Sequence, residues 1–149
     1  MDWLLVVEDQ IDLWTIIQRA LTDLSPPIPT RHAPNVITAL SHLHSCRIEG
    51  KSLPRFVLSD LYVPERTDGF HLLGAIKSAS SGFNHLPVVI MSSSTQDQDR
   101  QAVNERGGVY LVKPLTAKEW ADFLSTLQYY WRKSTTHIVD KCNNVGLQT

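Results

Sequence analysis

This sequence has few cysteines and no excess of either sign of charge. Its two cysteines, Cys46 and Cys142, stand far apart and fit no metal-binding spacing. We expect them to be reduced thiols of a cytoplasmic protein. Fourteen basic residues oppose fifteen acidic ones, for a formal net charge of −1. Without a basic excess or a basic run, nothing predicts binding to the phosphates of DNA or RNA.

Long apolar runs are missing as well. No run approaches the roughly 18–20 residues that a membrane-spanning helix needs. The amino-terminal segment 1–7 enters an apolar run with no basic stretch before it, so no signal peptide is expected. The composition therefore predicts a protein with no membrane association.

Short apolar runs alternate with helical periods along most of the chain. The 149 residues, 42% of them hydrophobic, suffice for one domain with a proper core. Residues 3–7 are almost wholly apolar, as in a parallel strand that is covered on both faces. Strands are expected at 3–7, 28–32, 56–58, 88–91 and 109–112, and helices at 13–24, 36–43, 70–76, 96–106 and 120–130. This order predicts an α/β fold, a mainly parallel five-stranded sheet between two layers of helices.

The carboxyl-terminal segment is different. Residues 134–149 are polar and carry no apolar period. We expect residues 1–133 to form the domain and residues 134–149 to form a polar tail.

Polar side chains stand where the expected strands end. Glu8 and Asp9 come after the first expected strand, Asp60 after the third, Ser92 after the fourth and Lys113 after the fifth. Ligands of open α/β sheets bind at the carboxyl ends of the strands. These three carboxylates, one hydroxyl and one ammonium are therefore expected to meet in one pocket.

The chemistry of this set points to phosphoryl transfer. Three neighbouring carboxylates repel one another unless a cation compensates them, and Mg²⁺ prefers oxygen ligands of this kind. Asp60 can attack phosphorus and form an acyl phosphate. Lys113 and Ser92 can hold the remaining phosphoryl oxygens, because such reactions depend on positioning and charge stabilisation.

With these motifs, residues 3–131 resemble the receiver domain of two-component response regulators. The resemblance implies the doubly wound, flavodoxin-like (βα)5 fold with strand order 2-1-3-4-5. The single-domain regulators associated with bacterial phytochrome kinases are the most similar type, with a longer segment after Pro64 and an aromatic end of the last helix. The matching segments are Leu4-Leu5-Val6-Val7-Glu8-Asp9, Phe56 to Pro64 followed by Asp68-Gly69, Pro87 to Ser93, and Tyr110-Leu111-Val112-Lys113-Pro114.

The resemblance also implies roles for single residues. Asp60 would be the phosphoacceptor, and Glu8, Asp9, Asp60 and the Tyr62 carbonyl would bind Mg²⁺. Ser92 would be the switch hydroxyl and Tyr110 the switch aromatic. Lys113 would contact the phosphoryl group, and the Lys113–Pro114 peptide would be cis.

The partners implied are a sensor histidine kinase or a phosphotransfer protein, and a downstream protein target. The chain would be a signalling protein and not an enzyme. Tyr129 and Trp131 flank the apolar stripe of the last helix, either as the margin of the core or as an exposed aromatic patch of the kind that marks an interface. In the second case we expect a homodimer through the face of the fourth helix, the fifth strand and the fifth helix.

The sequence departs from the family pattern beside the predicted site. One extra residue separates Pro64 from Asp68-Gly69, so the loop is expected to differ locally. Tyr62 is bulky, and we hypothesise that it shields an acyl phosphate on Asp60 from water.

The sequence disfavours two other functions and leaves a third open. Phosphatases of the haloacid dehalogenase type have the motif Asp-x-Asp at the nucleophile, where the second Asp is the acid–base. Here Tyr62 stands at that second position, so the acid–base is absent. A flavodoxin-like cofactor binder needs a hydroxyl- and Gly-rich phosphate loop, whereas Glu8-Asp9-Gln10 would repel phosphate. An unphosphorylated scaffold with the same fold stays open as an alternative.

Overall fold

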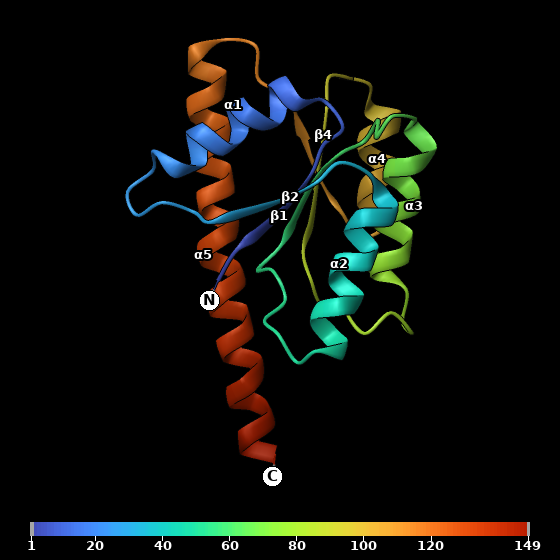
Figure 1. Ribbon diagram of the computed structural model, residues 1–149, viewed down its shortest axis with the longest axis vertical. Coiled ribbons are helices and arrows are strands. Elements are labelled where there is room, and N and C mark those ends of the chain that lie inside the picture. Colours follow the sequence, from blue (N-terminus) through green and yellow to red (C-terminus); the bar gives the residue numbers. More distant parts are fainter. Residues whose placement is uncertain (1, 149) are drawn as a thin grey trace.

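The computed structural model describes the backbone of residues 2–148 and the side chains of residues 2–134. Five parallel strands form one sheet in the order β2-β1-β3-β4-β5, which confirms the predicted fold (Figure 1). The elements are β1 (Leu4–Val7), α1 (Ile11–Thr22), β2 (Thr30–Ala33), α2 (Val36–Ile48), β3 (Val57–Asp60), α3 (Arg66–Lys77), β4 (Val88–Ser92), α4 (Asp97–Glu105), β5 (Val109–Val112) and α5 (Ala117–Gln148).

Helices cover both faces of the sheet, so the central strands are buried on both sides. Successive side chains of a strand point to opposite faces. Leu5 and Val7 therefore pack with α2, α3 and α4, while Leu4 and Val6 pack with α1 and α5. The two layers of helices lie on opposite sides of the sheet in Figure 1. The continuous apolar runs of the sequence are explained by this double coverage.

Several element boundaries differ from the expected ones. β2 begins at Thr30 and not at residue 28, and the preceding Pro29, which has no N–H, contributes its carbonyl to Leu4. α2 continues to Ile48, which was expected in a loop. α3 begins at Arg66, four residues before its apolar stripe, because Glu65 and Asp68 form a capping box there.

The last helix includes most of the segment that was expected to form a tail. The backbone of α5 is helical to Gln148, past residue 134. The division at residue 134 into domain and tail stays a prediction, and Cys142 lies outside the described side chains.

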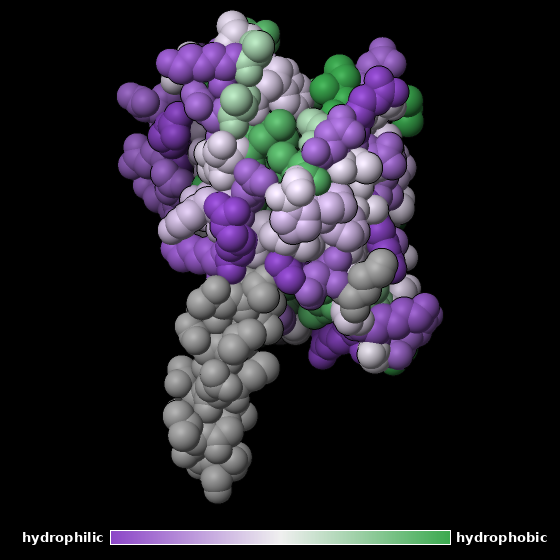
Figure 2. Space-filling view, turned by 90° about the vertical axis from the view of Figure 1, so that its left-hand side faces the viewer, coloured by the Kyte–Doolittle hydropathy of each residue, from purple (hydrophilic) through white to green (hydrophobic). Residues whose placement is uncertain are grey.

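No helix in the described part of the chain is long and apolar enough to cross a membrane. Figure 2 shows the side of the molecule where α1 and α5 lie, and polar side chains occupy most of that surface. α1 nevertheless leaves Ile11 and Ile16 more than half exposed.

At the amino-terminal ends of the strands, one arginine connects three segments of the chain. The Arg55 guanidinium lies 4.1 Å from the centre of the Trp131 ring on α5. It also donates a 2.5 Å hydrogen bond to the Asp2 carboxylate, whose pKa it lowers. The start of the chain, the approach to β3 and α5 are thus held together at the edge opposite the strand ends that carry the acids.

Candidate functional site

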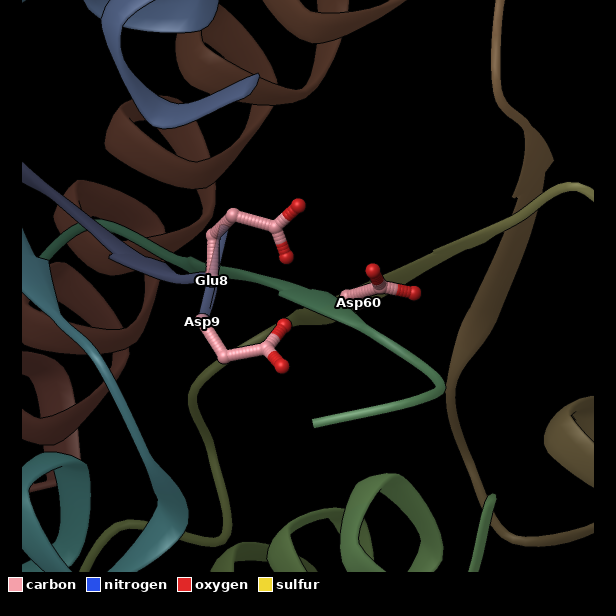
Figure 3. A group of neighbouring side chains, drawn as sticks. All are labelled: Glu8, Asp9 and Asp60. Atoms are coloured by element: carbon pink, nitrogen blue, oxygen red, sulfur yellow. The ribbon is translucent and has the colours of Figure 1, made fainter. Parts of the chain in front are cut away.

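The three acidic side chains meet at the carboxyl ends of β1 and β3 (Figure 3). One carboxylate oxygen each from Glu8, Asp9 and Asp60 lies within 4.8 Å of the others. Glu8 and Asp60 are buried, while Asp9 is exposed. Because the strands are parallel neighbours, residues far apart in sequence come together at this edge, as the strand-end pattern predicted.

Asp60 is held by two donors. Its Oδ2 accepts a 2.5 Å hydrogen bond from Lys113 Nζ, and its Oδ1 accepts a 3.2 Å bond from the Tyr62 backbone N–H. Lys113 comes from the end of β5, two strands away from β3. The only positive side chain predicted for the pocket therefore lies directly against the carboxylate that was predicted to accept the phosphoryl group.

The Lys113–Pro114 peptide was expected to be cis, and this expectation was wrong. The cis peptide bonds of the described residues are Ser25–Pro26 and Val63–Pro64. The trans form of an X–Pro bond is favoured by about 0.5–1 kcal/mol. Lys113 stays in line with the sheet through a 2.8 Å bond from its N–H to the Ser92 carbonyl, so its ammonium reaches Asp60 without a cis bond.

Glu8 is fully buried, and neither of its carboxylate oxygens has a hydrogen-bond partner among the described residues. Lys113 Nζ lies 3.9 Å from Oε1. Burial and then the charge of Asp60 raise the pKa of Glu8 to about 8, while Lys113 opposes the shift. A buried carboxyl group without a partner is costly, and a bound cation would remove that cost. The acidic triad can therefore bind a divalent metal.

Ser92 ends β4 beside the acids. Its side chain is buried, and its Oγ accepts a 3.2 Å hydrogen bond from the Ser94 N–H. The hydroxyl hydrogen is left free to donate elsewhere. Ser92 lines an open hollow of about 750 Å³ together with Asp9, Asp60, Tyr62 and Lys113. The hollow is large enough for a metal ion, its waters and a phosphoryl group.

Tyr110 is buried on β5 and reaches the loop after β4. Its hydroxyl donates a 2.6 Å hydrogen bond to the Ser94 carbonyl. The sequence indicated Tyr110 but not Ser94, which is the last residue of the serine run 92–94. It also missed Asp99, a buried acid of α4 that lines the same hollow. Its signal was a weak one: α4 has few apolar residues to bury.

The extra residue after Pro64 is absorbed by the start of α3. The Glu65 side chain accepts from the Asp68 N–H, and the Asp68 side chain accepts from the Glu65 N–H at 3.0 Å. The Gly69 N–H then donates to the Leu61 carbonyl at 3.1 Å. A Cβ on Gly69 would lie 2.2 Å from that carbonyl oxygen, so this close return of the loop requires glycine.

Comparisons with known proteins agree with this architecture. The pattern of the response regulator receiver domain matches residues 4–124. Over 129 residues the chain is 33% identical to the probable methanogenesis regulatory protein FilR2 of Methanothrix harundinacea, covering 86% of this chain and 82% of that protein.

Two solved structures are also similar. One is the bacteriophytochrome response regulator AtBRR, with 27% identity, a TM-score of 0.65 and coverage of 84% of this chain and 91% of that one. The Mn²⁺-bound form of response regulator Rcp1 shares the fold at 23% identity, with a TM-score of 0.73 and coverage of 88% and 94%. The chain belongs to the family of response regulator receiver domains.

Proposed function

We propose that this receiver domain accepts a phosphoryl group on Asp60 from a sensor histidine kinase or a phosphotransfer protein. One observation carries the proposal: the Asp60 carboxylate lies 2.5 Å from Lys113 Nζ, beside Glu8 and Asp9, in a hollow that Ser92 also lines. A nucleophilic carboxylate, a cation and a hydroxyl are the groups that phosphoryl transfer needs.

The reaction is a displacement at phosphorus. An Asp60 oxygen forms a bond to the phosphorus atom while the bond between phosphorus and the donor's imidazole nitrogen breaks. The nitrogen keeps the electron pair and takes up a proton. Lys113 and Ser92 hold the phosphoryl oxygens, and both come from strand ends, which fixes their positions before the group arrives.

The acidic residues fit Mg²⁺. The side chains of Glu8, Asp9 and Asp60 and the Tyr62 carbonyl would hold it. When bound, Mg²⁺ supplies positive charge that offsets the three carboxylates and the incoming phosphoryl group. The buried Glu8 carboxylate, which accepts no hydrogen bond from the described residues, supports this assignment.

The output is a change of protein-binding surface. Ser92 would be drawn toward the phosphoryl group, and its bond from the Ser94 N–H links that movement to the carbonyl that holds Tyr110. Ser92 and Tyr110 thereby bias a two-state surface that a downstream protein reads.

One observation favours a second candidate, an unphosphorylated scaffold. Tyr110 is buried and bonded to the Ser94 carbonyl through contacts that the protein itself supplies. A module with a constitutively set surface would have the same arrangement.

The test is intact mass spectrometry of the wild type and an Asp60→Asn variant after incubation with Mg²⁺ and acetyl phosphate. A labile gain of one phosphoryl mass in the wild type alone is the expected result. If neither acetyl phosphate nor a phosphorylated histidine kinase labels the wild type, the phosphoacceptor proposal is wrong and the scaffold remains.

A homodimer through the face of α4, β5 and α5 is part of this proposal. Val112, Leu115 and Tyr129 are exposed on or next to β5 and α5 and would be covered by a second copy. Light scattering with and without beryllofluoride, a phosphoryl mimic, tests it, and a monomer in both conditions contradicts it.

A further inference from the structure

α4 is anchored to the domain by unusually little apolar surface. Its buried residues are Asp99 and Val103, so one of its two buried side chains is charged. A helix normally owes its position to an apolar stripe. Polar contacts must therefore carry much of the positioning of α4.

The strongest of these contacts is an ion pair to α3. Arg66 donates from Nε and Nη2 to the same oxygen of Asp99, at 2.9 and 2.8 Å. The Asp99 side chain is only 8% exposed and that of Arg66 is 42% exposed. A nearly buried carboxylate whose partner is removed is left uncompensated, so the pair strongly favours the docked position of α4.

Arg66 also stands at a particular place in the chain. It is the first residue of α3 and directly follows the loop that leaves Asp60. The loop is tied to the acceptor at its start, where the Tyr62 N–H donates to Asp60 Oδ1. Only five residues, 61–65, separate Asp60 from Arg66, so this segment offers a short route between them.

On the other side, α4 contacts the switch tyrosine. Arg100, next to Asp99, places its guanidinium 5.1 Å from the centre of the Tyr110 ring. Such cation–π contacts contribute about 0.5–1 kcal/mol at exposed sites. Arg106, just after α4, lies 4.7 Å from the ring of Phe70, and Arg66 lies 4.6 Å from the same ring. α4 is thus fastened to α3 at both of its ends.

We propose that Arg66 and Asp99 form a latch that couples the loop after Asp60 to α4 and so holds Tyr110 in its buried position. The coupling to phosphorylation rests on the proposed function; the latch itself does not. Arg66 and Asp99 are positioning residues that act through α4. This route is separate from the one through Ser92 and Ser94, so the switch receives the state of Asp60 from both sides of the hollow.

The first experiment measures the latch without any phosphoryl chemistry. Hydrogen exchange of residues 97–105 is compared in the full chain for wild type, Arg66→Gln, Asp99→Asn and the double variant. We expect roughly tenfold faster exchange of this segment in Arg66→Gln, which leaves a buried carboxylate unpaired. Asp99→Asn, which keeps a hydrogen-bonding oxygen, should give a smaller increase.

In the double variant the effect should not exceed that of Arg66→Gln, because both changes remove one interaction. Arg19→Gln, a change of an exposed arginine on α1, is the matched control and should leave the segment unchanged. Exchange of α1 reports whether each variant is folded. Wild-type exchange of residues 97–105 in Arg66→Gln would overturn the latch.

The second experiment measures the coupling as the affinity for beryllofluoride with Mg²⁺. Because the latch favours the buried position of Tyr110, which the phosphorylated state is expected to share, Arg66→Gln should bind the mimic about fivefold more weakly. Equal affinity despite faster exchange of α4 would overturn the coupling. If the wild type itself binds no beryllofluoride, the proposed function fails, and the exchange result still decides the latch.

Discussion

The hydroxyl of Tyr110 donates a 2.6 Å hydrogen bond to the backbone carbonyl of Ser94. The same Ser94 donates its N–H to Ser92 Oγ. A single residue therefore connects the hydroxyl at the predicted acceptor site with the aromatic ring of the neighbouring strand. The position of the ring is set by the loop after β4 as well as by the core.

Replacing Tyr110 with Phe tests this connection. The ring keeps its packing, while the Ser94 carbonyl loses its donor, so the free energy of unfolding should fall by about 1 kcal/mol. Urea unfolding of the metal-free protein measures the change. Tyr129→Phe, at an exposed ring on α5, is the control and should change little. An unchanged midpoint for Tyr110→Phe would show that the bond contributes nothing.

The raised pKa of Glu8 makes the stability of the metal-free protein depend on pH. The folded state holds the Glu8 proton up to a pKa of about 8, whereas the unfolded state loses it near the ordinary value of 4.5. Between these values the folded state binds more protons, so the free energy of unfolding should decrease as pH rises from 4.5 to 8.

Two measurements check this pH dependence. In Glu8→Gln the decrease should be much smaller, as seen by thermal unfolding across the range. In the wild type, Mg²⁺ should bind with release of protons below pH 8, which calorimetry in buffers of different ionisation enthalpy detects. Equal slopes for the two proteins would contradict the assignment of the shift to Glu8.

A pair of glycines in α3 gives a matched test of the loop after Asp60. In Gly69→Ala the new methyl group would meet the Leu61 carbonyl, so we expect a loss of at least about 2 kcal/mol of stability. In Gly74→Ala the methyl group meets nothing within 4 Å, and helix propensity should add about 0.5–1 kcal/mol. Denaturant unfolding compares them, and similar effects of the two changes would refute the tight turn.

Tyr62 lines the acidic hollow and is 43% exposed. If its ring keeps water from an acyl phosphate on Asp60, Tyr62→Asn should lose the phosphoryl group several-fold faster than the wild type. The decay after removal of acetyl phosphate, followed by intact mass, measures this. A lifetime equal to that of the wild type would remove the shielding hypothesis.

Most of the fold could be predicted because it depends on simple patterns. The apolar run at 3–7 indicated a strand that is buried on both faces. The positions of Glu8, Asp60 and Lys113 at strand ends indicated that they meet at one edge of the sheet. The contacts within the site could not be predicted. Lys113 pairs with Asp60 at 2.5 Å, while the Glu8 carboxylate has no hydrogen-bond partner among the described residues. Both facts depend on side-chain conformations and not on spacing.

The polar side of α4 could not be predicted either. Asp99 and Arg66 lie 33 positions apart and belong to different helices, so no local period connects them. The Lys113–Pro114 peptide is trans, against expectation. The expected cis form was an implication of the family resemblance, and no pattern in the chain itself indicated it.

The contact of Arg55 with Asp2 and Trp131 lies at the opposite end of the sheet from the acidic hollow. A biosensor surface or a fluorescent reporter coupled near that contact would leave the hollow open to the kinase that we propose as its partner. α5 also leads to this contact, because it begins just beyond β5 and runs from one end of the sheet to the other (Figure 1). The molecule could therefore be immobilised for kinetic measurements without blocking the chemistry that those measurements are meant to follow.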